Sequence, residues 1–532
     1  MMRGTGGTSG GWTGYLAGLW LVALAVRQLP LVVTGRWAGE FSWDEGVYMV
    51  ASQKLINGVW PYADFLLVHP PGIVLFLTPF AALANVIPDA IAASIARTAI
   101  SALGATSAVL VALLLRRYGR AAAVAGSVLY AVWSATVWSE WAILLEPLLA
   151  VGVLGALLLL GKDAAPATVP SLRRTATAGA ILGLGLTVKL WAAVPLAVLA
   201  LMLLVRSPNR LGWGRAVAFG GAAIAAVAVV MTPFLVVAGP ATVWRDVVGF
   251  QIGRPEAPVS WGTRLAYFNG SLLAPDRLPD AVWLAVGLAA LVVSVVAVVA
   301  LARARAVPLR TWEPTSWLVL ATAQVLVLLN APSFYPTYTL AAAPALCLVA
   351  GIAAQFLVER LRIEERGPVI RRGVAGFGVA VALVLVVMST RQIGPGLHAA
   401  RDWSVVDRLE QEAAGVDGPR CVWAPTPEVL LEADVADDQT RQQCPTTIDV
   451  YATVLRELGV ADAEFDTSAP FAQVYQAQVA AELANSEVAI VDEAAWKRLN
   501  EANQDLIHDR FVPEGTAGPY TIWRADDTRP RS

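Results

Sequence analysis

The 532 residues are 57% hydrophobic and only 15% charged, with a mean hydropathy of +0.59, and these values exclude a soluble protein. The 39 basic and 41 acidic side chains nearly cancel, so the chain lacks the basic field that nucleic-acid binding needs. Three cysteines without a Cys-x-x-Cys pair exclude a zinc ribbon or an iron–sulfur site and allow at most one disulfide. A polytopic α-helical membrane protein is the class that remains.

Apolar stretches follow one another from residue 12 to residue 389, each of the length that crosses a bilayer as a helix. Five arginine-rich clusters, at 116–120, 162–174, 206–215, 303–310 and 360–372, separate them. If all five face the cytoplasm, two crossings lie between successive clusters. This predicts about eleven transmembrane helices, with the N-terminus in the cytoplasm and the C-terminus outside. They are expected near residues 12–34, 89–115, 121–139, 143–161, 175–189, 190–205, 215–238, 280–302, 315–331, 338–358 and 373–389.

One further apolar stretch, Gly72 to Ile87, is shorter than a comfortable span and follows Pro70-Pro71. If it crossed the membrane, the cluster at 116–120 would face outward. We therefore expect it to lie in the outer interface or to re-enter from it. A complete crossing is the alternative.

The chain divides by polarity into a membrane domain, residues 1–390, and a polar tail, residues 391–532. The tail alternates short strand-like and helix-like segments, which predicts a small extracytoplasmic α/β domain. Strands are expected at 421–423, 487–492 and 520–523, and helices at 450–458, 471–483 and 493–500. Cys421 and Cys444 either form a disulfide outside the cytoplasm or are two unpaired buried thiols.

The first outer loop, residues 36–88, concentrates unusual side chains. Val47, Tyr48, Ala51 and Leu55 recur at helical spacing before Gly58, which predicts an amphipathic helix on the membrane surface. Asp44 stands in its first turn, where the helix dipole favours a carboxylate. The structural alternative is that Asp44 only caps the helix.

The loop motifs are Asp-Glu-Gly-x-Tyr at 44–48, Gly-x-x-Pro-Tyr-x-Asp at 58–64 and Pro-Pro-Gly at 70–72. This pattern resembles the first loop of GT-C glycosyltransferases, closest to the branch of protein O-mannosyltransferases and aminoarabinose transferases. The resemblance implies a polyprenyl-phosphate-sugar donor, action on the outer membrane face and Asp44 as the catalytic carboxylate. It also implies substrate-binding roles for matching residues further along the chain, namely Arg97, Glu146, Lys189, Tyr335 and Tyr338.

The residue types support the same chemistry. Sugar transfer from a lipid phosphate needs a base near the acceptor hydroxyl and positive groups near the departing phosphate. We expect Asp44, with Glu45 beside it, to do the catalytic work, and Asp64, His69 and Arg254 to bind substrate. A divalent cation, held by Asp44 or Glu146, is left open. The structural alternatives are a lysine that snorkels at position 189 and a turn hydrogen bond at His69.

The sequence therefore predicts a hexosyl- or pentosyltransferase of the plasma membrane that moves a sugar from a polyprenyl-phosphate donor to a cell-envelope acceptor. Membrane lipids are its other expected partners. A lipid or solute transporter, or flippase, is the first alternative and would place functional charges in mid-span and show an internal repeat. A non-catalytic envelope scaffold is the second, and it would leave Asp44 dispensable.

Overall fold

The computed structural model describes residues 9–161, 170–206, 210–254, 259–269, 278–305, 313–393, 403–406, 421–458 and 473–526. The chain forms two compact units. The first unit holds Met1–Leu31, Thr98–Val230 and Ala257–Gly396; the second holds Val32–Arg97, Met231–Glu256 and Leu397–Ser532. The first loop and the polar tail thus belong to one unit, although they lie far apart in the sequence. Lys162 and Arg310, which we assigned to cytoplasmic clusters, lie outside the described residues.

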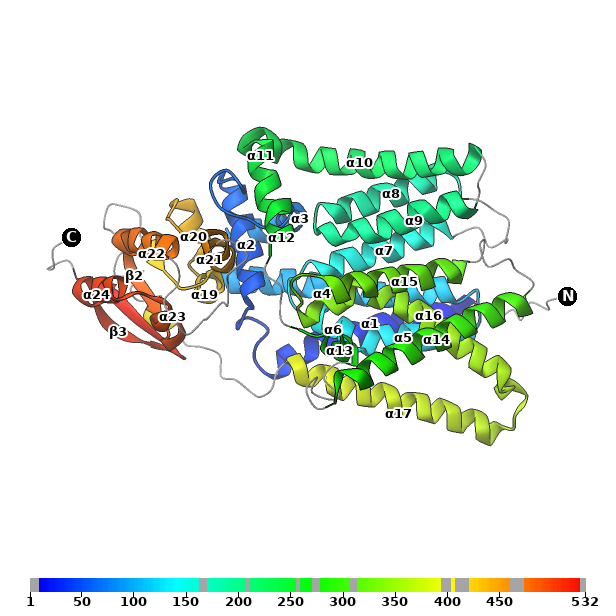
Figure 1. Ribbon diagram of the computed structural model, residues 1–532. Coiled ribbons are helices and arrows are strands. Elements are labelled where there is room, and N and C mark those ends of the chain that lie inside the picture. Colours follow the sequence, from blue (N-terminus) through cyan, green and yellow to red (C-terminus); the bar gives the residue numbers. More distant parts are fainter. Residues whose placement is uncertain are drawn as a thin grey trace. The chain divides into compact units, whose positions relative to one another are not determined.

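Long apolar helices lie side by side in the first unit (Figure 1). Two of them, α5 and α16, approach closely because Gly126 and Gly351 lie where they meet: a Cβ on Gly126 would stand 2.7 Å from the Cys347 carbonyl oxygen, and one on Gly351 2.7 Å from that of Ala122. The helices with residues in this unit are α1 (Ser9–Val33), α4 (Asp89–Leu115), α5 (Arg120–Val132), α6 (Ser134–Glu140), α7 (Glu146–Leu160), α8 (Leu172–Leu186), η1 (Leu190–Ala192), α9 (Ala193–Arg206), α10 (Arg210–Ala238), α13 (Trp261–Ala266), η3 (Tyr267–Asn269), α14 (Asp280–Ala304), α15 (Glu313–Asn330), η6 (Pro336–Ala341), α16 (Ala343–Arg360), η7 (Ile363–Glu365) and α17 (Pro368–Ile393).

A helix occupies the position of each predicted span. Within the described residues, six helices are long and apolar enough to cross a membrane, and α5 with α6, bent by 48°, is a candidate seventh span. The multi-span helical class is confirmed, whereas the count of eleven and the orientation of the termini stay predictions. Helix α3 (Gly72–Leu83) has 12 residues, about 18 Å of helix against a hydrocarbon core of about 30 Å. Its length supports the interfacial or re-entrant placement.

A buried ion pair joins the helices of the first unit. The Arg27 guanidinium donates from Nε to Glu140 Oε2 at 2.9 Å, and both side chains have no exposed surface. The Tyr130 hydroxyl donates to Glu140 Oε1 at 2.7 Å, and Arg27 also donates to the Ala23 carbonyl. Gly104 leaves room for the carboxylate. With its charges balanced and its donors used, this cluster is structural.

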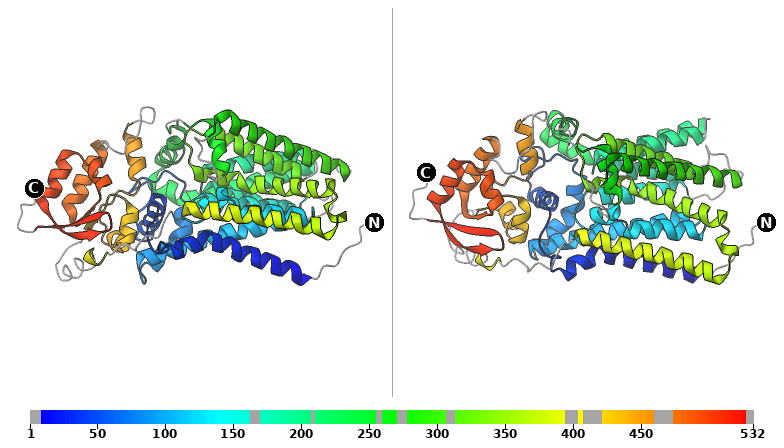
Figure 2. Two further views of the ribbon diagram at one scale, coloured as in Figure 1. Left: turned by 90° about the horizontal axis from the view of Figure 1, so that it is seen from below. Right: turned by 60° about the horizontal axis from the view of Figure 1, so that its bottom comes forward.

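The second unit contains a four-stranded sheet in the order β1-β2-β4-β3. Strand β1 (Cys421–Trp423) runs parallel to β2 (Ser486–Val491), and β4 (Tyr520–Ala525) runs antiparallel to β2 and to β3 (Phe511–Ala517). Figure 2 shows the β3–β4 hairpin in red. The helices of this unit are α2 (Trp43–Ile56), α3, α11 (Pro240–Val243), η2 (Trp244–Gly249), α12 (Phe250–Ile252), α19 (Pro427–Glu432), α20 (Ala436–Arg441), α21 (Val450–Leu458), α22 (Gln473–Asn485), α23 (Glu493–Arg498) and α24 (Glu501–Arg510). The three strands and three helices expected in the tail are present, whereas β3, α19, α20 and α24 were not predicted.

Helix α2 lies inside the second unit. It contacts α3, α19 and α20, and every residue from Glu45 to Lys54 is buried. Gly46 permits the approach of α19, since a Cβ there would stand 2.3 Å from the Glu428 backbone nitrogen. The predicted amphipathic helix on the membrane surface is therefore wrong: helices from the tail cover the side that we expected to be exposed.

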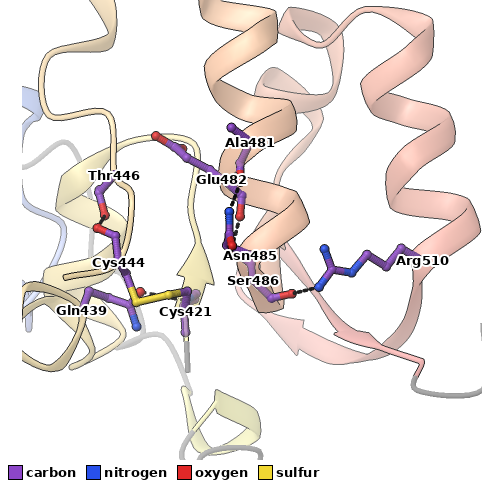
Figure 3. The surroundings of a disulfide bond; sticks show 10 residues. Cys421, Gln439, Cys444, Thr446, Ala481, Glu482, Asn485, Ser486 and Arg510 are labelled. Carbon is purple, nitrogen blue, oxygen red and sulfur yellow. Dashed lines mark hydrogen bonds between the residues drawn. A yellow bond between two sulfur atoms is a disulfide. The ribbon is translucent and has the colours of Figure 1, made fainter. Parts of the chain in front are cut away.

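A disulfide joins Cys421 on β1 to Cys444 in the segment after α20 (Figure 3). Gln439 lies beside it and accepts a hydrogen bond from the Val422 amide at 2.8 Å. The bond closes a segment that contains α19 and α20, the two helices that pack on α2. Cys347 in the first unit is a buried free thiol.

Candidate active site

Ser42 caps the N-terminus of α2, and its backbone amide donates to Glu45 Oε2 at 2.8 Å. Asp44 therefore stands one residue inside the helix, and its side chain is exposed. The capping role that we considered for Asp44 belongs to Ser42. The first-turn position still puts the Asp44 carboxylate at the positive end of the helix dipole, which favours the ionised form.

Glu45 and Arg97 form a bidentate ion pair with no exposed surface. Arg97 Nε donates to Oε1 at 2.8 Å, and Nη2 donates to Oε2 at 2.9 Å. The remaining guanidinium nitrogen, Nη1, donates to the Arg36 carbonyl at 3.0 Å, and the Phe41 ring lies 4.4 Å from the guanidinium carbon. One arginine thus fixes the chain on both sides of Ser42. This geometry suits Glu45 to positioning its neighbour Asp44.

Asp64 and His69 shape the turn that follows α2. Asp64 is exposed and accepts a hydrogen bond from the Trp60 amide at 2.7 Å. Tyr62, in the left-handed region at φ +68°, donates its hydroxyl proton to the His69 carbonyl at 2.6 Å. The His69 ring meets Tyr48 edge to face at 6.1 Å. The turn hydrogen bond at residue 69 is thus present through the backbone, and the imidazole packs on α2.

Arg254 belongs to the same unit. Its Nη1 donates to Gln251 Oε1 at 3.4 Å, and its guanidinium carbon lies 5.6 Å from the Phe250 ring. The Gln251 amide donates to the Val68 carbonyl at 2.8 Å, which holds this segment against the first loop. The second unit thus gathers six of the predicted residues, Asp44, Glu45, Asp64, His69, Arg97 and Arg254.

The first unit gathers the other four. Lys189 pairs with Glu146, and both side chains are almost completely buried. The ammonium nitrogen lies 3.9 Å from the Tyr338 ring centre and 5.0 Å from that of Trp191, so aromatic faces and a carboxylate surround it. Tyr335 meets Tyr338 edge to face at 5.4 Å and is exposed. Lys189 is thus held in place rather than left to snorkel.

No group of three or more His, Cys, Asp or Glu side chains among the described residues is placed to hold a metal ion. Glu146, one of the two suggested ligands, is paired with Lys189. The two suggested ligands thus belong to no such group in the described part of the chain, and a divalent cation is left open.

Trp191, which the sequence interpretation did not single out, completes the surroundings of Lys189. The side chains of Lys54, Glu432 and Glu482 in the second unit were also missed, and all three are buried. A signal existed for Lys54, because lysine occurs at only four positions in this arginine-biased chain. Nothing in the sequence marked Glu432, whose Oε1 accepts the Phe41 amide at 3.0 Å.

The fold was compared with solved structures. ArnT from Cupriavidus metallidurans, in a crystal structure bound to undecaprenyl phosphate, superimposes with a TM-score of 0.59 at 14% sequence identity, over 98% of this chain and 99% of that one. The chain shares its fold with ArnT. The Archaeoglobus fulgidus oligosaccharyltransferase, tethered to an acceptor peptide, matches with a TM-score of 0.51 at 13% identity, over 97% of this chain and 74% of that one.

The chain thus shares the fold of these two proteins, and a fold of this kind is what the first-loop resemblance implied. No protein-family model and no curated protein sequence matches the chain. At this level of identity, activity has to be argued from the side chains.

Proposed function

We propose that the protein is a glycosyltransferase that moves a sugar from a polyprenyl-phosphate donor to a cell-envelope acceptor on the outer face of the plasma membrane. One observation carries the proposal: Asp44 is an exposed carboxylate at the start of α2, next to a buried ion pair that fixes the surrounding backbone. The shared fold with ArnT, crystallised with undecaprenyl phosphate, supports the donor class.

In this mechanism Asp44 accepts the proton of the acceptor hydroxyl. The hydroxyl oxygen forms its bond to the anomeric carbon as the bond from that carbon to the phosphate oxygen breaks. The phosphate leaves as an anion and needs no proton, and the sugar inverts its configuration. Glu45 and Arg97 act by positioning Asp44, because their charged groups are used by each other.

Lys189, in the first unit, stays a proposed substrate contact, as the first-loop resemblance implies. Glu146 balances the charge of Lys189, and Tyr338 and Trp191 fix its direction. Asp64, His69, Arg254 and Tyr335 remain proposed substrate contacts. A divalent cation enters no step, and chelation with EDTA tests the requirement directly.

The orientation is proposed from the arginine clusters alone. An alkaline-phosphatase fusion at Ser532 should be active if the tail lies outside. An inactive fusion at normal expression would reverse the topology and remove Asp44 from the outer face.

The deciding experiment compares a deletion strain complemented with wild type or with Asp44→Asn at matched expression. Mass spectrometry of lipid-linked sugars and envelope glycans should show donor accumulation and glycan loss, restored by wild type alone. Full restoration by Asp44→Asn would favour a transporter or a scaffold. The sugar that accumulates would also decide between hexosyl and pentosyl transfer.

A further inference from the structure

Two cavities adjoin in the second unit, with volumes of about 610 and 800 Å³. They share five lining residues, Asp64, Phe65, Leu66, Thr453 and Gln478. Both volumes fall in the range typical of small-molecule binding sites. The first loop, the 231–256 segment and the tail all contribute walls, so the hollow exists only when the three segments assemble.

The smaller cavity contains a buried pair of opposite charges. Lys54 is 6% exposed and Glu482 is 7% exposed, and they attract each other electrostatically. Burial lowers the pKa of Lys54 and raises the pKa of Glu482 to about 7. Thr447 donates its hydroxyl proton to Glu482 Oε1 at 2.7 Å. Burying charged and polar groups costs free energy unless they are hydrogen-bonded. A polar molecule bound in the cavity would offset that cost.

The larger cavity also brings opposite charges together. Asp246 is 2% exposed and lies between two arginines, at 2.8 Å from Arg245 Nε and 3.6 Å from Arg456 Nη1. Tyr62 and Phe65 add aromatic surface to its wall, and Thr242 adds a hydroxyl. Together the two cavities are lined by three basic and four acidic side chains.

We infer that the joined cavities bind a neutral glycan, the sugar chain of the acceptor. Nearly balanced charge gives no net attraction to a polyanion or a polycation, and the many charged groups disfavour an isoprenoid chain. The lining combines carboxylate, amide, hydroxyl and aromatic groups, which match a polyol with donors and acceptors at its rim and C–H groups on its faces. The inference rests on the proposed function, since it supplies that reaction with its acceptor class.

Gln478 offers a test that spares the fold. It is exposed, lies on α22 and lines both cavities, so Gln478→Trp would fill the space that they share. Gln473, also exposed on α22, lines neither cavity, and Gln473→Trp is the matched control. Purified full-length protein in detergent is titrated with mannotetraose and with arabinofuranotetraose, and binding is followed by saturation-transfer NMR.

Wild type and Gln473→Trp should bind at least one tetrasaccharide with the same affinity, and Gln478→Trp should bind it at least tenfold more weakly. Binding of a polyprenyl phosphate should be equal in all three. The inference is overturned if wild type binds neither tetrasaccharide, if Gln478→Trp binds as wild type does, or if a sugar phosphate displaces the neutral chain. Tetrasaccharide binding that survives in a protein without transfer activity would reject the proposed reaction and keep this site.

Discussion

Two fully buried arginine–glutamate pairs in this molecule have the same chemistry and different surroundings. Arg27–Glu140 in the first unit is closed on all sides by Tyr130 and by backbone carbonyls. Arg97–Glu45 in the second unit is equally buried, yet the residue before Glu45 is exposed. A buried ion pair fixes the backbone around it. It contributes to function only where that backbone carries a functional group.

The largest expected effect is the loss of transfer activity when Asp44, the exposed residue before Glu45, is changed. Asp44→Asn should lower the transfer rate by about 10²–10⁴-fold, the range for loss of a general base. Its stability should stay within about 0.5 kcal/mol of wild type, because the side chain is exposed. Transfer assays and thermal unfolding on the same preparation measure both. If the variant keeps its activity, a residue other than Asp44 is the base.

Breaking the closed pair should act on stability instead. Glu140→Ala leaves Arg27 buried without its partner and should cost about 3–5 kcal/mol. Thermal unfolding in detergent measures the loss. The double variant Arg27→Met/Glu140→Leu is the control and should recover most of it. Equal loss in the double variant would show that packing, not charge, carries the effect.

The Lys189–Glu146 pair of the first unit is proposed to contact substrate, so breaking it should affect substrate binding. Lys189→Met removes a charge-assisted bond of about 1.5–3 kcal/mol to substrate, so KM for that substrate should rise about 10–100-fold. Steady-state kinetics against substrate concentration measure it. Lys497→Met is the control, because it makes the same change at an exposed lysine whose ion pair with Glu493 lies on the surface. An unchanged KM would reduce Lys189 to a structural partner of Glu146.

Weakening the second pair should have a smaller effect. Glu45→Gln keeps an acceptor for Arg97 and loses the charge, so kcat should fall about tenfold at unchanged KM as Asp44 becomes less well positioned. Arg97→Lys should behave alike, because a lysine cannot bind both carboxylate oxygens in parallel. A fall in kcat as large as that of Asp44→Asn would identify Glu45 as the base.

The smallest effect concerns pH and Glu482. Because burial raises its pKa in the folded protein to about 7, the folded state holds a proton that the unfolded state, with a pKa near 4.5, has lost. Stability should therefore fall as pH rises from 6 to 8, by about 1 kcal/mol for this one group. Thermal unfolding of wild type and Glu482→Gln at both values measures it. Equal slopes in the two proteins would contradict the protonated state.

The sequence predicted the long apolar helices well, missed three short helices of the tail, and gave little indication of which helices pack together. Hydrophobic length located every long helix, and the first-loop motifs indicated the fold, because both signals are local. The burial of α2 was not predicted because α19 and α20, which cover it, come from the distant tail. The pairings of Glu45 with Arg97 and Glu146 with Lys189 span 52 and 43 residues and follow from no local pattern. Strand β3 escaped because Pro513 and Gly515 interrupt its alternation, where the structure shows a register shift.

The order in which the second unit is made has a consequence for the cell. Its three stretches are translated far apart, and about 370 residues separate the end of α2 at Ile56 from the start of α19 at Pro427. At roughly 5–20 residues per second, α2 waits roughly 20–70 s for the helices that cover it. During that time the side of α2 that α19 and α20 cover lacks its native partners, whereas α3, which follows α2 directly in the chain, is already available to pack on it. A nascent chain therefore cannot present a finished α2 before α19 and α20 have been synthesised.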